Sequence, residues 1–427
     1  MLNPFFLGTD LSKNLPPLSA KNQEILKETT IDADHPGTIL ADWQTMLDLI
    51  GENGIEVSSK QCYFSIKILA EINQKLTHPI LIDLKRPVQK SYPYIHGLYL
   101  LLRVSGMTKV VHQGSKTKLI INTDLLKDWQ KLNTTEQYFI LLEIWMFWAR
   151  EITSLDNYSH FHFPYLLALQ RLWQMIPDKG VKITVKNESV YNLNRSEEMV
   201  NVAMLNLFGI IDLQQGKPQV GKGWRLTYLA KTPLGEALIN LLNLTIINDN
   251  SLLTKEDTED VIYGNLQPVF QDWFPEFKQQ LIIKSFANQE GIFVFKVSLE
   301  KAWRRISIPS DLTLEFLADA ILEAFDFDND HLYRFICHGS FGRPLEINHP
   351  YVEAPPDTTE FIVGKLPLEV GEKMIFNFDF GDDWEFLMLL EAINPPNSKQ
   401  KNAKILASYG STPPQYGYYN DDDDDDD

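Results

Sequence analysis

A short run of alternating phenylalanines near the end of the chain constrains the fold most. Residues 376–380 alternate phenylalanine with Asn377 and Asp379, and this period of two is typical of a strand with one buried face. Glycine and two aspartates follow at 381–383, and these residues favour a tight turn. Residues 384–393 then continue as a second strand. The sequence therefore predicts a β-hairpin in this region.

Four carboxylates lie within seven positions of this hairpin, at Asp379, Asp382, Asp383 and Glu385. Carboxylates this close can bind a hard cation or hold a raised pKa for acid–base work. They can equally cap a tight turn, since aspartate bonds its own backbone there. Because the spacing of a calcium-binding EF-hand is absent, we favour the turn and expect no metal and no catalytic residue.

The composition predicts a globular protein of two or three domains. The chain has 427 residues, of which 44% are hydrophobic and 22% charged. We expect no membrane span, because no run of 18 apolar residues occurs, and no signal peptide. Cys62 and Cys337 lie far apart, which excludes a disulfide framework and favours the cytoplasm. No cofactor motif is found, and we expect no cofactor.

The net charge of −18 is unevenly distributed. Residues 1–280 have 27 basic and 30 acidic side chains, whereas residues 281–427 have 12 and 27. Residues 60–131 reverse the balance, with 12 basic and 4 acidic side chains. Such a basic patch within an acidic protein suits a phosphate backbone, although it also suits an ordinary solvated face.

The same order of elements occurs twice in the first 280 residues: a helix, a glycine, a two-stranded hairpin and another helix. This order resembles winged-helix domains, which commonly grip DNA with a recognition helix and a basic wing. The two glycines are about 103 residues apart. The first unit is predicted at 94–105, Gly106, 107–112, 118–122 and 123–132, and the second at 197–208, Gly209, 210–214, 224–229 and 232–242.

A DNA-contacting role is expected only for the first of these units. Its helix is mostly apolar but offers His96, Tyr99 and Arg103, whereas the second helix opens with Glu197 and Glu198, which repel phosphates. The second unit is then structural or a partner surface. The candidate DNA-binding residues are Lys85, Arg86, Lys90, Arg103, Lys109, Lys116 and Lys118.

Four regions follow from these patterns, and the predicted class is α+β with a mainly helical N-terminal part. His160 and His162 lie two positions apart, but no third metal ligand is identifiable. A composition shift marks a boundary near residue 285. The predicted regions are 1–135 with the first winged-helix-like unit, 136–280 with the second unit and a linker, an α+β domain at 285–420, and an acidic tail at 421–427.

The α+β domain resembles the plasmid pRiA4b ORF-3-like family. The motifs that carry the resemblance stand in the family's order at 303–306, 309–314, 331–335 and 378–385, with a closing segment at 407–414. The resemblance implies a curved antiparallel sheet and an association with plasmids and mobile elements. It implies no established activity, so no catalytic residue is carried over. The family often has histidine where this chain has Phe386 after Trp384-Glu385.

A possible polar site in this domain combines Arg304, Arg305 and His331 with the four carboxylates of the hairpin. We expect Arg304 and Arg305 to pair with Asp379 and Asp382 across the sheet, which is a structural alternative to an active site. The terminal aspartates at 421–427 are interpreted as a solvated run that aids solubility or mimics phosphate.

Three functional hypotheses remain from the sequence. The first is a non-enzymatic DNA-associated protein of mobile-element type, which binds the duplex backbone through the first unit and uses the C-terminal domain as a partner or regulatory module. The second is a protein–protein adaptor that recruits a basic partner through the C-terminal domain. The third is a metal-dependent enzyme that uses the carboxylate cluster.

Overall fold

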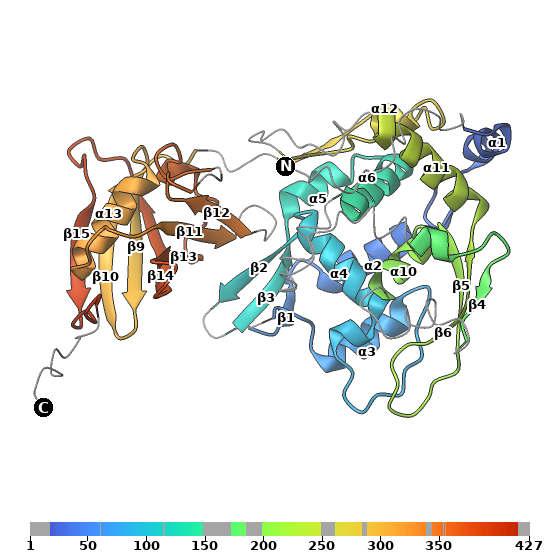
Figure 1. Cartoon of the computed structure of the whole chain (residues 1–427), viewed down its shortest axis with the longest axis horizontal. Helices are drawn as coiled ribbons and strands as arrows, with labels where there is room; N and C mark the ends of the chain where they lie inside the picture. The colour runs from blue at the N-terminus through green and yellow to red at the C-terminus, as the bar shows by residue number, and fades with distance from the viewer. Residues whose placement is uncertain are drawn as a thin grey trace, which may run out of the picture. The chain divides into compact units, whose positions relative to one another are not determined.

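The chain folds into two compact units, residues 1–284 and residues 285–427. We call them the helical unit and the sheet unit. A computed structural model describes residues 18–59, 61–113, 116–147, 172–184, 199–248, 261–283, 288–338, 344–352, 354 and 356–416. The predicted α+β class is confirmed, with a helix-rich first unit and a seven-stranded antiparallel sheet in the second (Figure 1).

The helical unit holds the two helix–hairpin–helix segments expected from the sequence. Its described elements are α1 (Ala20–Glu28), α2 (Ile39–Ile50), β1 (Ile55–Val57), α3 (Ile66–Lys75), η3 (Gln89–Ser91), α4 (Pro93–Val104), β2 (Thr108–Gln113), β3 (Lys116–Ile121), α5 (Thr123–Trp129), α6 (Thr134–Phe147), β4 (Val181–Lys182), α10 (Met199–Leu207), β5 (Ile211–Gln215), β6 (Leu226–Lys231), α11 (Pro233–Asn248), β7 (Val261–Tyr263), α12 (Gln267–Phe270) and β8 (Leu281–Ile283).

The two segments have matching backbones at their glycines. Gly106 and Gly209 both adopt positive φ, at 73° and 70°, and end α4 and α10 where a side chain is disfavoured. Two strands follow each glycine, and an earlier strand completes a three-stranded sheet, in the orders β1-β3-β2 and β4-β6-β5. The assignment of these segments to winged-helix domains stays a prediction. The histidines at 160 and 162 and the glutamates at 197 and 198 lie outside the described residues.

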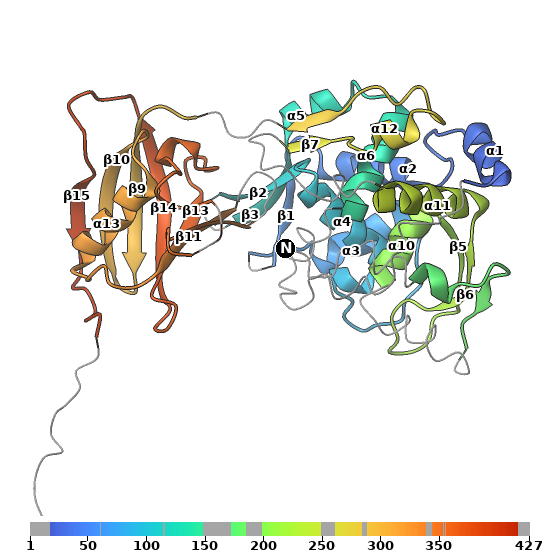
Figure 2. The same ribbon diagram turned by 45° about the horizontal axis from the view of Figure 1, so that its top comes forward.

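The helices α4 and α10 pack against each other at the centre of the helical unit (Figures 1 and 2). Gly97 permits the approach, because a Cβ atom there would lie 2.4 Å from Met204 Sδ. The Tyr94 hydroxyl donates to Asn206 Oδ1 at 2.8 Å. All twelve residues of α4 are buried. A helix that is apolar on every side is expected to lie inside a protein.

A buried glutamate ties α6 to the segment between β7 and α12. The Glu143 carboxylate accepts hydrogen bonds from the backbone N–H groups of Gly264 and Leu266, each at 3.0 Å, and from Asn265 Nδ2 at 3.1 Å. Burial raises the pKa of Glu143 to about 7, although these hydrogen bonds act in the opposite direction.

The sheet unit is a single antiparallel sheet in the order β12-β11-β13-β14-β9-β10-β15. Bulges interrupt the pairing at Arg305/Ile306 and at Leu390/Ala392, and bulges bend the strands that contain them. The described elements are β9 (Ile292–Leu299), β10 (Ala302–Pro309), α13 (Leu314–Phe325), β11 (Tyr333–His338), β12 (Pro344–Asn348), η7 (Val363–Lys365), β13 (Lys373–Phe378), β14 (Trp384–Asn394) and β15 (Lys404–Tyr409).

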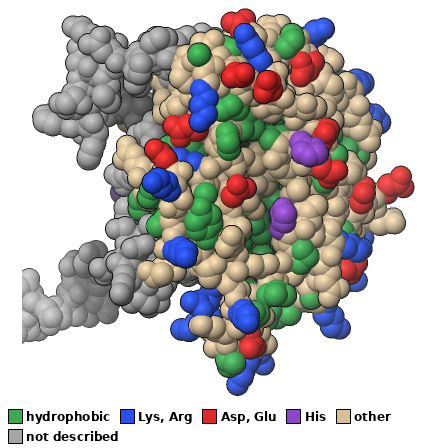
Figure 3. All heavy atoms as spheres, turned by 90° about the vertical axis from the view of Figure 1, so that its right-hand side faces the viewer, with side chains coloured by type: hydrophobic (Ala, Val, Ile, Leu, Met, Phe, Trp, Pro, Cys, Tyr) green, Lys and Arg blue, Asp and Glu red, His purple; other side chains and the backbone are tan. Residues whose placement is uncertain are grey.

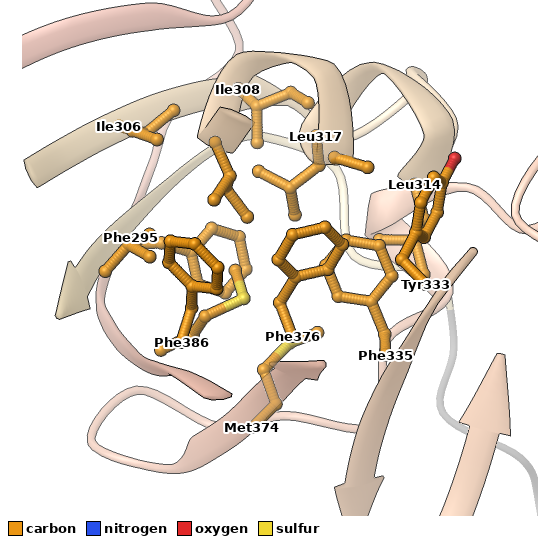
Figure 4. Close-up of a cluster of buried hydrophobic side chains, with 14 of the residues drawn as sticks. Phe295, Ile306, Ile308, Leu314, Leu317, Tyr333, Phe335, Met374, Phe376 and Phe386 are labelled. Carbon is orange, nitrogen blue, oxygen red and sulfur yellow. The ribbon is translucent and has the colours of Figure 1, made fainter. Parts of the chain in front are cut away.

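The core of the sheet unit lies between α13 and one face of the sheet. The buried positions of α13 are spaced three and four residues apart, as in Leu314, Leu317 and Ile321. Figure 4 shows Leu314 and Leu317 facing aromatic side chains of the sheet, among them Phe335 and Phe376. Phe376 and Phe378, the first two of the alternating phenylalanines, are thus strand residues that point into this core. The third, Phe380, lies in the turn after β13 and is 45% exposed, so the expected strand ends two residues early.

The hairpin predicted at 376–393 is confirmed as β13 and β14. Phe378 pairs with Trp384 across the turn. Asp379 and Asp383, at the two ends of the turn, have φ of 53° and 55°. Aspartate tolerates this left-handed region better than most residues because its short side chain bonds locally.

Two further findings concern membrane-spanning helices and the cysteines. No helix within the described residues is long and apolar enough to cross a bilayer. Cys62 and Cys337 are both free thiols and lie in different units.

We expect Gly209→Ala to destabilise the helical unit by about 3 kcal/mol or more. The left-handed backbone costs an alanine about 1–2 kcal/mol, and its Cβ would lie 2.2 Å from the Pro36 carbonyl oxygen. Gly221 is a matched control, because its φ is 72° but no atom lies within 4 Å of an added Cβ. Gly221→Ala should cost only about 1 kcal/mol. Urea unfolding measures both, and equal losses would contradict the close packing of Gly209.

Glu143 should make the helical unit less stable as the pH rises from about 4.5 to 7. Its folded pKa, about 7, lies above its ordinary value of 4.5, so the folded state binds the proton more tightly through this window. Relative to Glu143→Gln, the wild type should lose about 3 kcal/mol of unfolding free energy between pH 4.5 and 7.5. Urea unfolding of both proteins at these pH values tests this, and a constant difference would contradict it.

Candidate functional site

The structure separates the predicted DNA-binding residues into two groups. Lys85, Arg86 and Lys90 precede the first residue of α4, whereas Lys109 and the lysines of β3 follow its last residue. A twelve-residue helix is about 18 Å long, so the two groups flank opposite ends of α4. They do not form one continuous surface.

Arg103, the predicted basic residue within α4, is only 7% exposed. Its Nη1 donates to the Tyr99 hydroxyl at 2.9 Å, and the guanidinium lies 5.9 Å from the Tyr99 ring centre. Because it is buried, Arg103 is not available to contact DNA and is removed from the candidate interface. Leu98, Leu101 and Leu102 are completely buried in the same helix.

Exposing α4 to DNA would uncover these three leucines at a cost of about 1.5–3 kcal/mol each. The sum, roughly 5–9 kcal/mol, is comparable with the entire stability of a typical domain. The folded helical unit therefore does not offer α4 as a recognition helix.

Lys116 and Lys118 of β3 contact β1 and the turn that precedes it. Lys116 Nζ lies 3.1 Å from Glu56 Oε2, and both side chains are about 60% exposed. Lys118 Nζ donates to the Asn53 carbonyl oxygen at 3.3 Å. An exposed ion pair of this kind contributes little, so both lysines stay available to a phosphate that replaces these partners.

Two loops of the helical unit form a second basic surface, which we call the loop pair. It consists of residues 79–88, before η3, and residues 216–225, between β5 and β6. Main-chain bonds join them: Asp83 N–H donates to the Lys222 carbonyl oxygen at 3.3 Å, and Gly221 N–H donates to the Asp83 carbonyl oxygen at 2.7 Å. Gln215 Nε2 also donates to the Pro79 carbonyl oxygen.

The loop pair collects five cationic side chains. Lys85 and Arg86 were predicted from the sequence, and both are exposed. The other three come from the loop between β5 and β6: Lys217 and Lys222 are exposed and Arg225 is half-buried. Figure 3 shows basic side chains gathered at the lower end of its face, the end at which Figure 1 draws these loops.

Sequence reasoning missed three of these cations because it treated the second unit as electrostatically unsuited to DNA. A signal was present, since residues 216–223, between the two predicted strands of the second unit, include Lys217 and Lys222 and no acid. The pairing with a loop more than 130 positions earlier is set by the tertiary fold, which local spacing does not reveal.

A cavity of about 500 Å³ lies beside the loop pair. Tyr94 and Trp224 contribute aromatic rings to its wall, with centroids 5.1 Å apart. Its amide and hydroxyl side chains are already bonded: Gln215 Oε1 accepts from Trp224 Nε1, and Asn206 accepts from Tyr94. Among the described lining residues, polar side chains without such a hydrogen bond come from Asp34, His78 and Asp212.

Asp42 is buried behind this cavity. Its carboxylate accepts from the Thr77 N–H at 2.8 Å and from the hydroxyls of Thr77 and Thr38. Burial raises the pKa of Asp42, and these bonds partly offset the shift. The Asp42 carboxylate thus holds Thr38 and Thr77, which line the cavity, but is not itself a lining residue.

In the sheet unit, Arg304 is a structural residue. It is 8% exposed, its Nε donates to the Ala324 carbonyl oxygen at 2.7 Å, and its Nη2 donates to Thr412 Oγ1 at 3.0 Å. Its Nη1 donates to the carbonyl oxygen of Tyr409 at 3.0 Å. Arg304 thus joins α13, β10 and the end of β15.

The predicted pairing of Arg304 and Arg305 with Asp379 and Asp382 is wrong. Arg305 forms a bidentate pair with Glu391, with Nη2 at 3.0 Å from Oε1, and the hydrogen bonds from Arg305 lower the pKa of Glu391. The reason is strand order: β10 and β14 both flank β9, which brings Arg305 and Glu391 to the same face.

The carboxylates of the β13–β14 turn cap backbone and side-chain donors. Asp379 Oδ1 accepts from the Gly381 N–H at 2.9 Å, and Asp383 Oδ1 accepts from Asn377 Nδ2 at 2.8 Å. Asp382 and Glu385 are exposed. This arrangement agrees with the turn interpretation of the sequence.

His331 lies beside this turn, with Nε2 at 3.5 Å from Asp379 Oδ2 and 3.7 Å from Asp330 Oδ1. Tyr416 and Gln415 bond the same Asp330 carboxylate. Within the described residues, no three histidine, cysteine, aspartate or glutamate side chains are grouped as metal ligands. The possible polar site is therefore two separate places, the buried Arg304 and the His331–Asp379 contact.

The sheet unit matches a known family. Residues 292–416 match the family described as plasmid pRiA4b ORF-3-like protein, which confirms the resemblance drawn from the sequence for this region. The helical unit lies outside the matched residues. No curated protein matches the chain.

Part of the chain is also similar to solved structures. One of them is the crystal structure of a protein of unknown function from Methanosarcina mazei Go1, with 22% sequence identity and a TM-score of 0.27. The similarity covers 30% of this chain and 74% of that chain.

Arg304→Gln should destabilise the sheet unit by about 2–4 kcal/mol, because it leaves buried carbonyl groups without their charged donor. Arg305→Gln is the matched control, since it removes the same group from a half-buried ion pair that still contacts solvent and should cost less. Hydrogen exchange of the β10 amides measures the local stability of each variant. Equal effects of the two substitutions would contradict the structural role of Arg304.

Proposed function

We propose that the helical unit binds the phosphate backbone of nucleic acid through the loop pair. The observation that carries the proposal is the clustering of Lys85, Arg86, Lys217, Lys222 and Arg225 on two loops joined by main-chain bonds. Lysine and arginine side chains bind phosphates by neutralising their charge and releasing counterions. The predicted role as a DNA-associated protein is kept, with its contact surface moved to these loops.

The proposed binding is independent of base sequence. The helix that would read bases, α4, is buried against α10, and loops with exposed cationic side chains suit backbone contacts. A sequence preference is therefore not part of the proposal. The hairpin lysines at 109, 116 and 118 are a candidate second contact at the other end of α4.

The sheet unit has a separate proposed role as a partner or regulatory module. Residues 281–427 have 12 basic and 27 acidic side chains, which disfavours contact with phosphates and supports the recruitment of a basic protein partner. The adaptor role without nucleic-acid binding remains the second candidate, and the same charge imbalance favours it. The two free cysteines support a cytoplasmic setting for either role.

Binding of a 20-base-pair duplex should weaken steeply with salt if the loop pair carries it. Five neutralised phosphates predict a slope of about −4.5 in a plot of log K against log salt concentration. Lys217→Glu with Lys222→Glu should lower the affinity at least about tenfold at 0.1 M salt. Fluorescence anisotropy of a labelled duplex with the full chain measures both effects.

The hairpin supplies the matched control for this experiment. Lys116→Glu with Lys118→Glu introduces the same charge change at the other end of α4. If only this variant loses affinity for the duplex, the contact lies at the hairpin, and the assignment to the loop pair is overturned. Binding that ignores salt, or no binding at low salt, would reject nucleic-acid contact and leave the adaptor role.

A further inference from the structure

The strand β15 forms an open edge of the seven-stranded sheet. It pairs with β10 on one side, and no described residue pairs with its other side. Its apolar side chains are unusually accessible: Ile405 is 51% exposed, Leu406 54% and Tyr409 64%. The outward N–H and C=O groups of such a strand are a template for a further strand.

The opposite edge of the sheet is protected. β12 begins with Pro344, which cannot donate a ladder hydrogen bond. At its end, Asn348 N–H donates to the Pro356 carbonyl oxygen, and Thr358 N–H donates to the Asn348 carbonyl oxygen. Proteins commonly guard edges in these ways. β15 has no proline, and no segment among the described residues pairs with its outer side. The β15 edge is therefore open, whereas the β12 edge is protected.

The surroundings of β15 are locally cationic although the sheet unit is acidic. Lys399, Lys401 and Lys404 are exposed at the start of the strand, and residues 392–416 contain no acid. Because charges separated by more than about 8–10 Å are screened at physiological salt, these nearby lysines outweigh the distant carboxylates for a segment docked at the edge.

An aromatic platform adjoins the same edge. The rings of Trp303 and Tyr409 stack with centroids 6.1 Å apart. Lys296 Nζ lies 5.1 Å from the centre of the Trp303 ring, and the Arg305 guanidinium lies 5.3 Å from it. Because alternate residues of a strand point to opposite faces, a strand placed beside β15 could direct its acidic side chains toward this cationic face. Its apolar side chains would then point to the opposite face, where Ile405 pairs with Ile306.

We propose that β15 is a docking strand for an extended, acidic segment of a partner protein, which adds to the sheet as an eighth strand. Main-chain hydrogen bonds supply the pairing in this mode of recognition, and alternate side chains supply the specificity. The proposal goes beyond nucleic-acid binding and concerns the other unit. A second copy of this chain is a less suitable occupant, because its own β15 would bring three more lysines to the same edge.

Labelled eight-residue peptides test the proposal with the full chain. In the first peptide valine alternates with glutamate, in the second with lysine, and in the third proline replaces the two central valines of the glutamate peptide. The glutamate peptide should bind at least tenfold more tightly than the lysine peptide, and the proline peptide should not bind. Fluorescence anisotropy measures the affinities, and hydrogen exchange should show new protection at residues 404–409.

Two substitutions at the edge and one away from it make the test specific. Ile405→Glu with Leu406→Glu should weaken binding of the glutamate peptide at least tenfold, and Lys401→Gln with Lys404→Gln should weaken it and flatten its salt dependence. Leu387→Glu, on β14 in the interior of the sheet and 43% exposed, should leave binding unchanged.

Four results would overturn the proposal. The first two are tighter binding of the lysine peptide than of the glutamate peptide, and no binding of the glutamate peptide at concentrations up to 1 mM. The third is peptide-induced protection from hydrogen exchange outside β15. The fourth is a wild-type chain that is a dimer without peptide, with β15 already protected from exchange. The last result would identify a second copy as the occupant. Each of these outcomes is independent of whether the loop pair binds a duplex.

Discussion

The packing of α4 against α10 determines what the helical unit can do. In the winged-helix interpretation of the sequence these helices were the expected recognition helices, yet they pack against each other and most of their residues are buried. Gly97 opposite Met204 and the bond from Tyr94 to Asn206 fix their approach. The hydrophobic energy gained by burying the three leucines of α4 is comparable with the stability of a domain. Contacts with other molecules are therefore left to the loops and hairpins at the ends of these helices.

The sheet unit divides its polar residues between support and surface. Arg304 joins three elements from a buried position. The next residue, Arg305, has its side chain on the other face of the sheet and pairs with Glu391 beside the Trp303 ring. Strand alternation explains the difference, since neighbouring residues of β10 point to opposite faces. The same alternation places the phenylalanines of β13 in the core and Asn377 on the opposite face, where its buried amide bonds Arg334 and Asp383.

Local patterns in the sequence predicted the elements well and their partners poorly. The hairpin of β13 and β14 follows from a period of two and turn residues, and the family motifs lie on the strands of one unit. The burial of α4 was signalled by its apolar composition on all sides, but the pattern does not name α10 as its partner. The partner of Arg305 depended on strand order, and the loop pair joins residues far apart in the chain.

The main-chain bonds between Asp83 and the Gly221–Lys222 segment have an evolutionary consequence. Peptide groups are common to nearly every amino acid, so the register of the two loops does not depend on which side chains they carry. Mutations can then exchange lysines for acids or aromatic residues while the loops keep their relative position. A lengthened or shortened loop would break that register, which predicts that diverging copies drift in surface chemistry but conserve loop length.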